Sequence, residues 1–225
     1  KELMTKFVFA FEEGDGKNKQ LLGGKGANLC EMTQIGLNVP PGFVISTEAC
    51  LAYLADPDRR LPAGLMDEVR GHVQALEAKT GRKLGAGESP LLVSVRSGSA
   101  LSMPGMMDTI LNLGLNVTTL KGLIAATGNE RFAWDAYRRF IQLFGKVALG
   151  VADEAFDAVL ESVKKKAGVK ADIALSARDL REVSDRFLEL IESTPGRSFP
   201  DDPYEQLEIA IKAVFGSWMG KRAVD

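Results

Sequence analysis

Residues 21–29 read Leu-Leu-Gly-Gly-Lys-Gly-Ala-Asn-Leu, and this stretch marks a change from strand to helix patterning. Before it, residues 7–11 form a short apolar run that ends at the turn residues Gly14 and Gly16, which predicts a first strand. After it, the sequence predicts a helix over residues 27–35, with Gly36 placed to end it. The glycine-rich stretch is thus predicted to be the turn that leads into this helix.

The alternation of strands and helices continues to about residue 116. Residues 43–45 are predicted to form a strand, and Ser46 or Thr47 to cap a helix through Leu54. Apolar residues at helical spacing predict another helix across residues 66–76. Short apolar runs at residues 91–95 and 109–113 predict two further strands, so the first part of the chain mixes strands with helices.

From about residue 120 to residue 193 the apolar spacing is almost wholly helical. Ser176 and Asp179 have the spacing of a capping box, and Asp202 with Pro203 predicts the start of a last helix. We therefore expect an α+β fold in which residues 1–117 and 201–225 form one mixed subdomain. Residues 118–200 are expected to form an all-helical subdomain inserted into it.

Composition bounds the class of protein. The 225 residues are 45% hydrophobic and 26% charged, which is ordinary for a soluble globular protein. The formal net charge of -2 gives no sign of a nucleic-acid partner. No apolar run has the length of a membrane span, and the first residues lack the pattern of a signal peptide. Two cysteines do not make a disulfide framework, so we expect reduced thiols in a cytoplasmic protein.

The first candidate for chemistry is Lys25, within the glycines of residues 23–26. Glycines let the backbone approach a ligand closely, and a helix start suits an anion. The stretch is not a Walker loop, because the spacing and the trailing Ser or Thr are missing. The structural alternative is a tight turn with a solvated lysine.

The second candidate is Arg96, which follows a predicted buried strand and precedes Ser97, Gly98 and Ser99. The planar guanidinium suits a phosphate or a carboxylate, and the serines add hydroxyl donors. A ligand site is typical at the end of a strand in such folds. The structural alternative is an ion pair.

The third candidate is the loop at residues 102–109, which contains Pro104, Gly105, Met106, Met107 and Asp108. Its methionines give a soft apolar surface that suits a planar base, and core filling is the alternative. Asp108 is a candidate ligand for a metal or an arginine, and the sequence leaves both open. His72, in contrast, borders the apolar stripe of a predicted helix and is expected to be an ordinary helix residue.

Four segments together resemble the N-terminal part of the pyruvate phosphate dikinase family: residues 21–29, 41–43, 92–98 and 102–116. Residues 131–132, 137–141 and 213–218 extend the resemblance along nearly the whole chain. The run Ser-Met-Pro-Gly-Met-Met-Asp at residues 102–108 is the most specific part of the resemblance, whereas the first two segments are shared more loosely with phosphoenolpyruvate synthase.

The resemblance implies the first subdomain of an ATP-grasp type nucleotide-binding domain. The family converts ATP, phosphate and pyruvate to AMP, pyrophosphate and phosphoenolpyruvate with magnesium, through a phosphohistidine on a separate swivelling domain. It implies that Lys25 and Arg96 contact the nucleotide phosphates, and we expect the hydroxyl of Ser97, next to Arg96, to belong to the same site. It also implies that the loop with Gly105, Met106 and Met107 lies near the nucleotide.

The chain begins at Lys1 and ends at Asp225, so we expect a fragment of a larger phosphotransferase. Its partners would be ATP and the remaining domains of that enzyme: the second ATP-grasp subdomain with the acidic magnesium ligands, the phosphohistidine domain and the pyruvate barrel. The fragment is expected to hold no catalytic residue and no metal ligand, and to be inactive alone.

Two other functions remain open at the level of sequence. One is a fragment of a phosphoenolpyruvate synthase-type water dikinase, although that family tends to carry an acidic, threonine-bearing segment where this chain has its methionine-rich loop. The other is a nucleotide-binding module without catalysis. The full reading frame would separate them.

Overall fold

The computed structural model describes residues 5–98 and 109–218, and these divide into two compact units. As described, the first unit holds residues 5–81, 96–98 and 214–218, and the second unit holds residues 82–95 and 109–213. The described strands are short and form two-stranded sheets, while helices form most of both units. This mixture of helices and small sheets is that of an α+β fold, as the sequence predicts.

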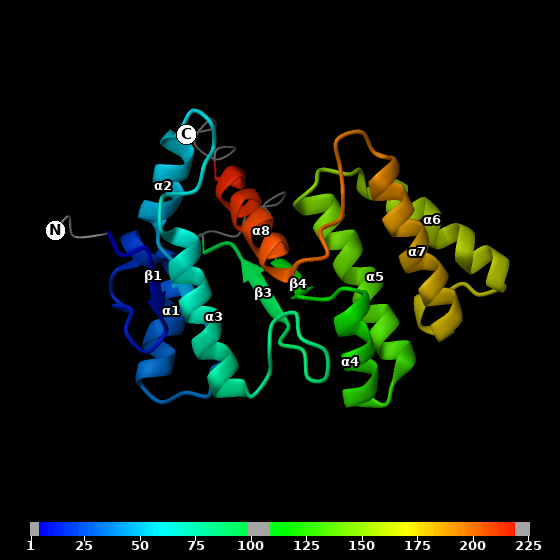
Figure 1. Cartoon of the computed structure of the whole chain (residues 1–225), viewed down its shortest axis with the longest axis horizontal. Coiled ribbons are helices and arrows are strands. Elements are labelled where there is room, and N and C mark those ends of the chain that lie inside the picture. The colour runs from blue at the N-terminus through cyan, green and yellow to red at the C-terminus, as the bar shows by residue number, and fades with distance from the viewer. Residues whose placement is uncertain (1–4, 99–108, 219–225) are drawn as a thin grey trace. The chain divides into compact units, whose positions relative to one another are not determined.

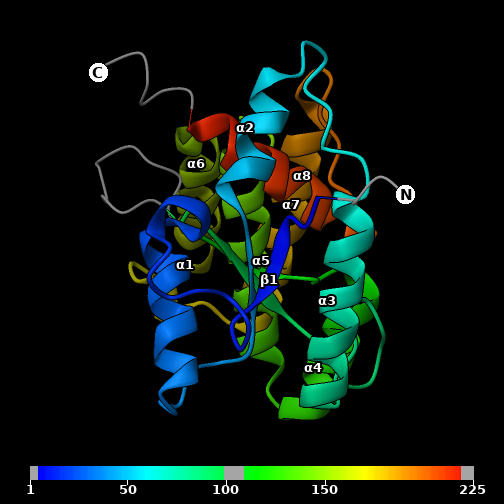
Figure 2. The ribbon, with the colours of Figure 1, turned by 90° about the vertical axis from the view of Figure 1, so that its left-hand side faces the viewer.

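The first unit is built around a pair of antiparallel strands. β1 (Val8–Ala10) pairs with β2 (Phe43–Ile45), and Phe9 lies opposite Val44. α1 (Lys19–Gln34) packs against β2 and against α2 (Thr47–Ala55), while α3 (Leu65–Thr80) packs against β1. Figure 2 shows β1 between α1 and α3. Ser46 caps α2 by accepting a hydrogen bond from the Ala49 N–H (3.3 Å), which confirms the predicted cap.

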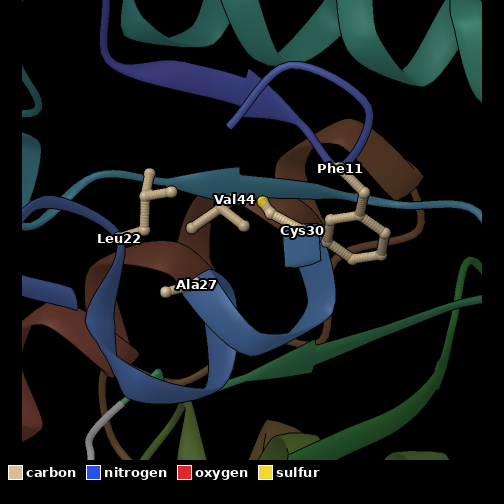
Figure 3. Close-up of a cluster of buried hydrophobic side chains, with 5 residues drawn as sticks. All are labelled: Phe11, Leu22, Ala27, Cys30 and Val44. Carbon is tan, nitrogen blue, oxygen red and sulfur yellow. The ribbon is translucent and has the colours of Figure 1, made fainter. Parts of the chain in front are cut away.

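A small hydrophobic cluster joins α1 to the strands of the first unit. Its side chains come from α1, from β2 and from the residue after β1, as Figure 3 shows: Phe11, Leu22, Ala27, Cys30 and Val44. All five are buried. Because Leu22 and Ala27 both belong to the cluster, the part of α1 between them is anchored at each end.

The second unit combines one pair of strands with a set of packed helices. β3 (Val93–Arg96) pairs with β4 (Thr109–Leu113), and α4 (Val117–Thr127) follows at once. α5 (Glu130–Val147) packs against β4, α4 and α7 (Ala177–Ser193), and α6 (Asp153–Ala167) packs against α7 (Figure 1). A short 3-10 helix, η1 (Asp172–Ala174), precedes α7.

Buried aromatic rings hold these helices together. Phe140 and Phe144 of α5 both make edge-to-face contacts with Phe199, with ring centroids 5.7 and 5.5 Å from that of Phe199. Phe156 of α6 meets Phe187 of α7 at 5.0 Å. Edge-to-face contacts of this kind are worth about 0.5–1.5 kcal/mol beyond the area that the rings bury.

The last helix, α8 (Pro203–Ser217), begins at the predicted proline, and Asp202 accepts a hydrogen bond from the Tyr204 N–H (3.0 Å). Gln206 in its first turn is fully buried. Its amide accepts from the Gly114 N–H (3.1 Å) and donates to the carbonyls of Leu115 (3.0 Å) and Pro200 (2.9 Å). One side chain therefore ties the start of α8 to the link between β4 and α4.

Candidate functional site

The glycine-rich stretch lies inside α1 and not in a turn before it, so the predicted helix start at residue 27 is wrong. Asn18 caps the helix by accepting a hydrogen bond from the Leu21 N–H (3.1 Å), and Leu22 is buried in the hydrophobic cluster. Together these extend the helix toward the N-terminus. At Gly23 the backbone leaves helical geometry, with φ 72° and ψ 164°, so α1 is two helical segments joined at a kink. Glycine adopts this left-handed φ at little cost.

Lys25 lies in the first turn of the helical segment that restarts after Gly23. The first N–H groups of a helical segment have no carbonyl partner within it, and its N-terminal end carries a partial positive charge. The Lys25 side chain is exposed, and it forms no ion pair with any residue in 5–98 or 109–218. The backbone and the side chain at this point therefore both favour an anion.

Arg96 and Ser97 stand where β3 ends. The guanidinium of Arg96 is exposed, and no carboxylate of the described residues pairs with it. Asp108, a possible ion-pair partner, lies outside the described residues. Ser97 is only 2% exposed, and its hydroxyl has no hydrogen-bond partner among the residues that the structure describes. A buried hydroxyl without a partner is uncommon in proteins and calls for an explanation.

A backbone contact brings these two segments together within the first unit. A Cβ atom placed on Gly23 would lie 2.5 Å from the carbonyl oxygen of Gly98 and 3.1 Å from its carbonyl carbon. The kink that precedes Lys25 therefore touches the residue that follows Ser97. The sequence predicted a phosphate site in each segment but did not predict that the two segments touch. The only sign of the contact in the sequence is a glycine in each segment, at positions 23 and 98.

The third candidate segment cannot be placed in the same way. Gly105, Met106, Met107 and Asp108 lie outside the described residues, and Thr109 is the first residue of β4. The candidate site therefore consists of Lys25, Arg96 and Ser97, which lie next to the contact between Gly23 and Gly98.

A different kind of cation occurs in the second unit. Arg138 of α5 is 4% exposed and forms ion pairs with Asp135 (2.8 Å) and Asp172 (3.3 Å). Asp172 also accepts a hydrogen bond from Lys164 (3.0 Å). Burial opposes ionisation of Asp172, but the hydrogen bond from Lys164 and the nearby charge of Arg138 together lower its pKa. These charges satisfy one another, whereas Lys25 and Arg96 have no ion-pair partner among the described residues.

Neither His72 nor the acidic residues form a second candidate site within the described part of the chain. His72 is half-buried in α3, and its ring centroid lies 5.4 Å from that of Phe43. Across residues 5–98 and 109–218, no group of three or more His, Cys, Asp or Glu side chains could hold a metal ion.

Two further features bear on the class of protein. Cys30 and Cys50 are both buried and form no disulfide with a described residue, and burial raises the pKa of the Cys30 thiol. Among the described helices, none combines the length and the apolar character that crossing a bilayer requires.

Comparison with known proteins identifies the family. The model of the pyruvate phosphate dikinase AMP/ATP-binding domain matches residues 19–61 and 57–225. Over 97% of its length the chain is 59% identical to the pyruvate, phosphate dikinase of Entamoeba histolytica and 50% identical to the chloroplastic enzyme of Mesembryanthemum crystallinum. It is 46% identical over 98% of its length to the pyruvate, phosphate dikinase of Clostridium symbiosum.

These relatives are much longer than the present sequence. The chain covers 24%, 23% and 25% of the three proteins, so it spans about a quarter of the length of the curated relatives that it matches. The matches confirm the resemblance seen in the glycine-rich, arginine-serine and methionine-rich segments. The chain therefore belongs to the pyruvate phosphate dikinase AMP/ATP-binding domain family.

Proposed function

We propose that this chain binds ATP, and that Lys25, Arg96 and Ser97 contact its phosphates. The observation that carries the proposal is the contact between Gly23 and Gly98, which joins the backbone segments of two exposed cations. Gly105, Met106 and Met107 are proposed to lie near the nucleotide, on the strength of the family resemblance alone.

The two cations would act on the phosphates in different ways. The guanidinium of Arg96 presents a planar fork that can hold two phosphate oxygens at once, whereas the ammonium of Lys25 is a mobile point charge. The unpaired N–H groups at the restart of α1 would add fixed donors. The Ser97 hydroxyl, which has no partner among the described residues, would gain one in the complex.

The wider function follows from the relatives. We propose that the chain serves the conversion of ATP, phosphate and pyruvate to AMP, pyrophosphate and phosphoenolpyruvate, together with protein beyond these 225 residues. In this proposal residues 1–117 and 201–225 are the first subdomain of an ATP-grasp domain, and residues 118–200 are its helical insertion. Magnesium would neutralise phosphate charge in that reaction, with ligands outside the residues described here.

The test is titration of the chain with ATP, followed by calorimetry or by amide chemical shifts. Lys25→Met and Arg96→Lys should each weaken ATP binding, because each removes one charged hydrogen bond or the fork geometry. A hydrogen bond to a charged group is worth about 1.5–3 kcal/mol, which is roughly a ten- to hundred-fold change in affinity.

Lys19→Met provides a matched control. Lys19 is also an exposed lysine of α1 without an ion pair to the described residues, but it precedes the kink. Its replacement should leave ATP affinity within about two-fold of the unmodified chain, since a surface charge change is worth only about 0.5 kcal/mol. Unchanged affinity in both Lys25→Met and Arg96→Lys would exclude these residues from the site.

A further inference from the structure

We propose that the contact between Gly23 and Gly98 is the device that holds Lys25 and Arg96 at a fixed separation, and that Gly23 is a positioning residue for the nucleotide phosphates. This inference rests on the proposed function of the two cations. It adds a residue that touches no ligand and acts only through its neighbour. The contact is asymmetric, and this asymmetry makes the proposal testable.

A methyl group at Gly23 would clash with main-chain atoms, whereas a methyl group at Gly98 would make only an ordinary contact with the described residues. The Cβ at Gly23 would lie 2.5 Å from the Gly98 carbonyl oxygen, whereas among the described residues the Cβ at Gly98 would lie closest to the Leu22 carbonyl oxygen, at 3.6 Å. The first distance requires movement, and the second is an ordinary contact. The positive φ of Gly23 adds strain for any other residue, while Gly98 has no such φ.

The anchoring of each side decides which segment would move. Leu22 and Ala27 fix the kink from both sides in the hydrophobic cluster, as Figure 3 shows. The Ser97 hydroxyl has no hydrogen bond to a described residue that would hold the other side in place. Gly98, which lies beyond the last residue of β3, is therefore the side that should yield, and the shift should pass back along the chain to Arg96.

The size of the movement follows from the contact distance. Restoring 3.4 Å, where ordinary contact begins, from 2.5 Å requires a shift of about 0.9 Å at Gly98. Arg96 lies two residues before Gly98 and would move with it. Misplacement of a binding group by about 1 Å can cost up to about a hundred-fold in function. We expect Gly23→Ala to weaken ATP binding about ten-fold.

Two control variants separate positioning from general damage. In Gly26→Ala, on the same helix, the new Cβ would lie 2.8 Å from Cγ1 of Val44, so it also disturbs the core but does not touch Gly98. Gly98→Ala removes the second glycine without a clash. Thermal unfolding of each variant measures the loss of stability, and ATP titration of each folded variant measures binding.

The decisive measurement is a double-mutant cycle between Gly23→Ala and Arg96→Ala. If Gly23 acts through Arg96, its replacement should weaken ATP binding about ten-fold in the unmodified chain and much less once Arg96 is alanine. Gly26→Ala should combine additively with Arg96→Ala, and Gly98→Ala should bind ATP like the unmodified chain. Amide resonances of Arg96 and Ser97 should shift in Gly23→Ala more than in Gly26→Ala, with or without ATP.

The outcomes distinguish this inference from the proposed function. Unaltered resonances of Arg96 and Ser97 in folded Gly23→Ala would overturn the inference, as would additivity with Arg96→Ala. If Gly23→Ala does not fold, ATP titration of Gly98→Ala becomes the test. Loss of ATP binding in that variant would contradict the claim that a methyl group is tolerated at Gly98 but not at Gly23. Failure of the unmodified chain to bind ATP would remove the proposed function and with it the positioning role.

Discussion

Replacement of Gln206 by methionine should destabilise the protein strongly, because this side chain makes three buried hydrogen bonds. Methionine has a similar shape but no amide, so the variant would lose the bonds to Gly114, Leu115 and Pro200 while it fills the same space. Three net hydrogen bonds at about 1 kcal/mol each give about 3 kcal/mol. All three partner residues are buried, so their orphaned backbone groups add a desolvation cost and bring the loss to about 3–5 kcal/mol.

Urea unfolding followed by circular dichroism measures this loss as a lower midpoint with an unchanged slope. Hydrogen exchange at the Gly114 amide adds a local reading, since that N–H loses its acceptor. Gln142→Met is the matched control: Gln142 is only half-buried and donates to two carboxylates at the surface of α6, so its loss should cost less than about 1 kcal/mol. A Gln206→Met variant that loses less than about 1 kcal/mol would show that these groups find other partners.

Two further predictions concern helix glycines and the ion pairs of Asp172. In Gly122→Ala the new Cβ would overlap the carbonyl oxygen of Gly87, so the free energy of unfolding should fall by about 1–3 kcal/mol. In Gly71→Ala, in α3, the new Cβ meets nothing within 4 Å, so the free energy of unfolding should rise by about 0.5–1 kcal/mol. Thermal unfolding of the two variants checks both signs. The pKa of Asp172 in the folded protein is below 3.8, the ordinary pKa of an aspartate, which we take for the unfolded chain. Its stabilising contribution is therefore present at neutral pH and is lost as the pH falls below 3.8 and through the pKa of the folded protein. Asp172→Asn should therefore reduce stability at neutral pH, and the gap to the unmodified chain should close below that pH; a gap of constant size across a pH series of urea titrations would contradict this.

Local signals in the sequence predicted most of the elements. The structure confirms three helix starts that the sequence predicted: the cap at Ser46, the capping box of Ser176 with Asp179, and the proline at position 203. These signals work because a cap depends only on residues within one turn. The strand at Phe43–Ile45 and the strand at Thr109–Leu113 were also predictable from short apolar runs.

The helix starts and faces that depend on tertiary packing were harder to predict. Three glycines within four residues argue against a helix by propensity, yet α1 runs through them because Leu22 and Ala27 are buried in one cluster. On α5 the large apolar residue Phe132 is 51% exposed, and the buried face begins at Ala133 and includes Phe140. Side-chain size and hydrophobicity alone would have placed Phe132 inside, so the face that is buried depends on what the helix packs against.

The candidate site shows the same division between local and long-range information. The residue types at positions 25 and 96 predicted an affinity for phosphate, but no local pattern connects Gly23 to Gly98. Their contact depends on where the whole strand end lies relative to α1. The only sign of such a contact in the sequence is a glycine at each position, and glycines also occur for other reasons, such as turns and helix ends.

The contrast among the cations of this chain strengthens the assignment of the site. Arg138 is buried and paired, so its charge stabilises the helices around it. Lys17 and Lys19 are exposed, and neither forms an ion pair with the described residues, but no backbone contact described for them resembles the one between Gly23 and Gly98. Lys25 and Arg96 combine exposed charges with a backbone contact between Gly23, which the cluster around Leu22 holds in place, and Gly98. A charge on fixed backbone loses less freedom when it binds a phosphate, so more of its interaction energy remains as affinity.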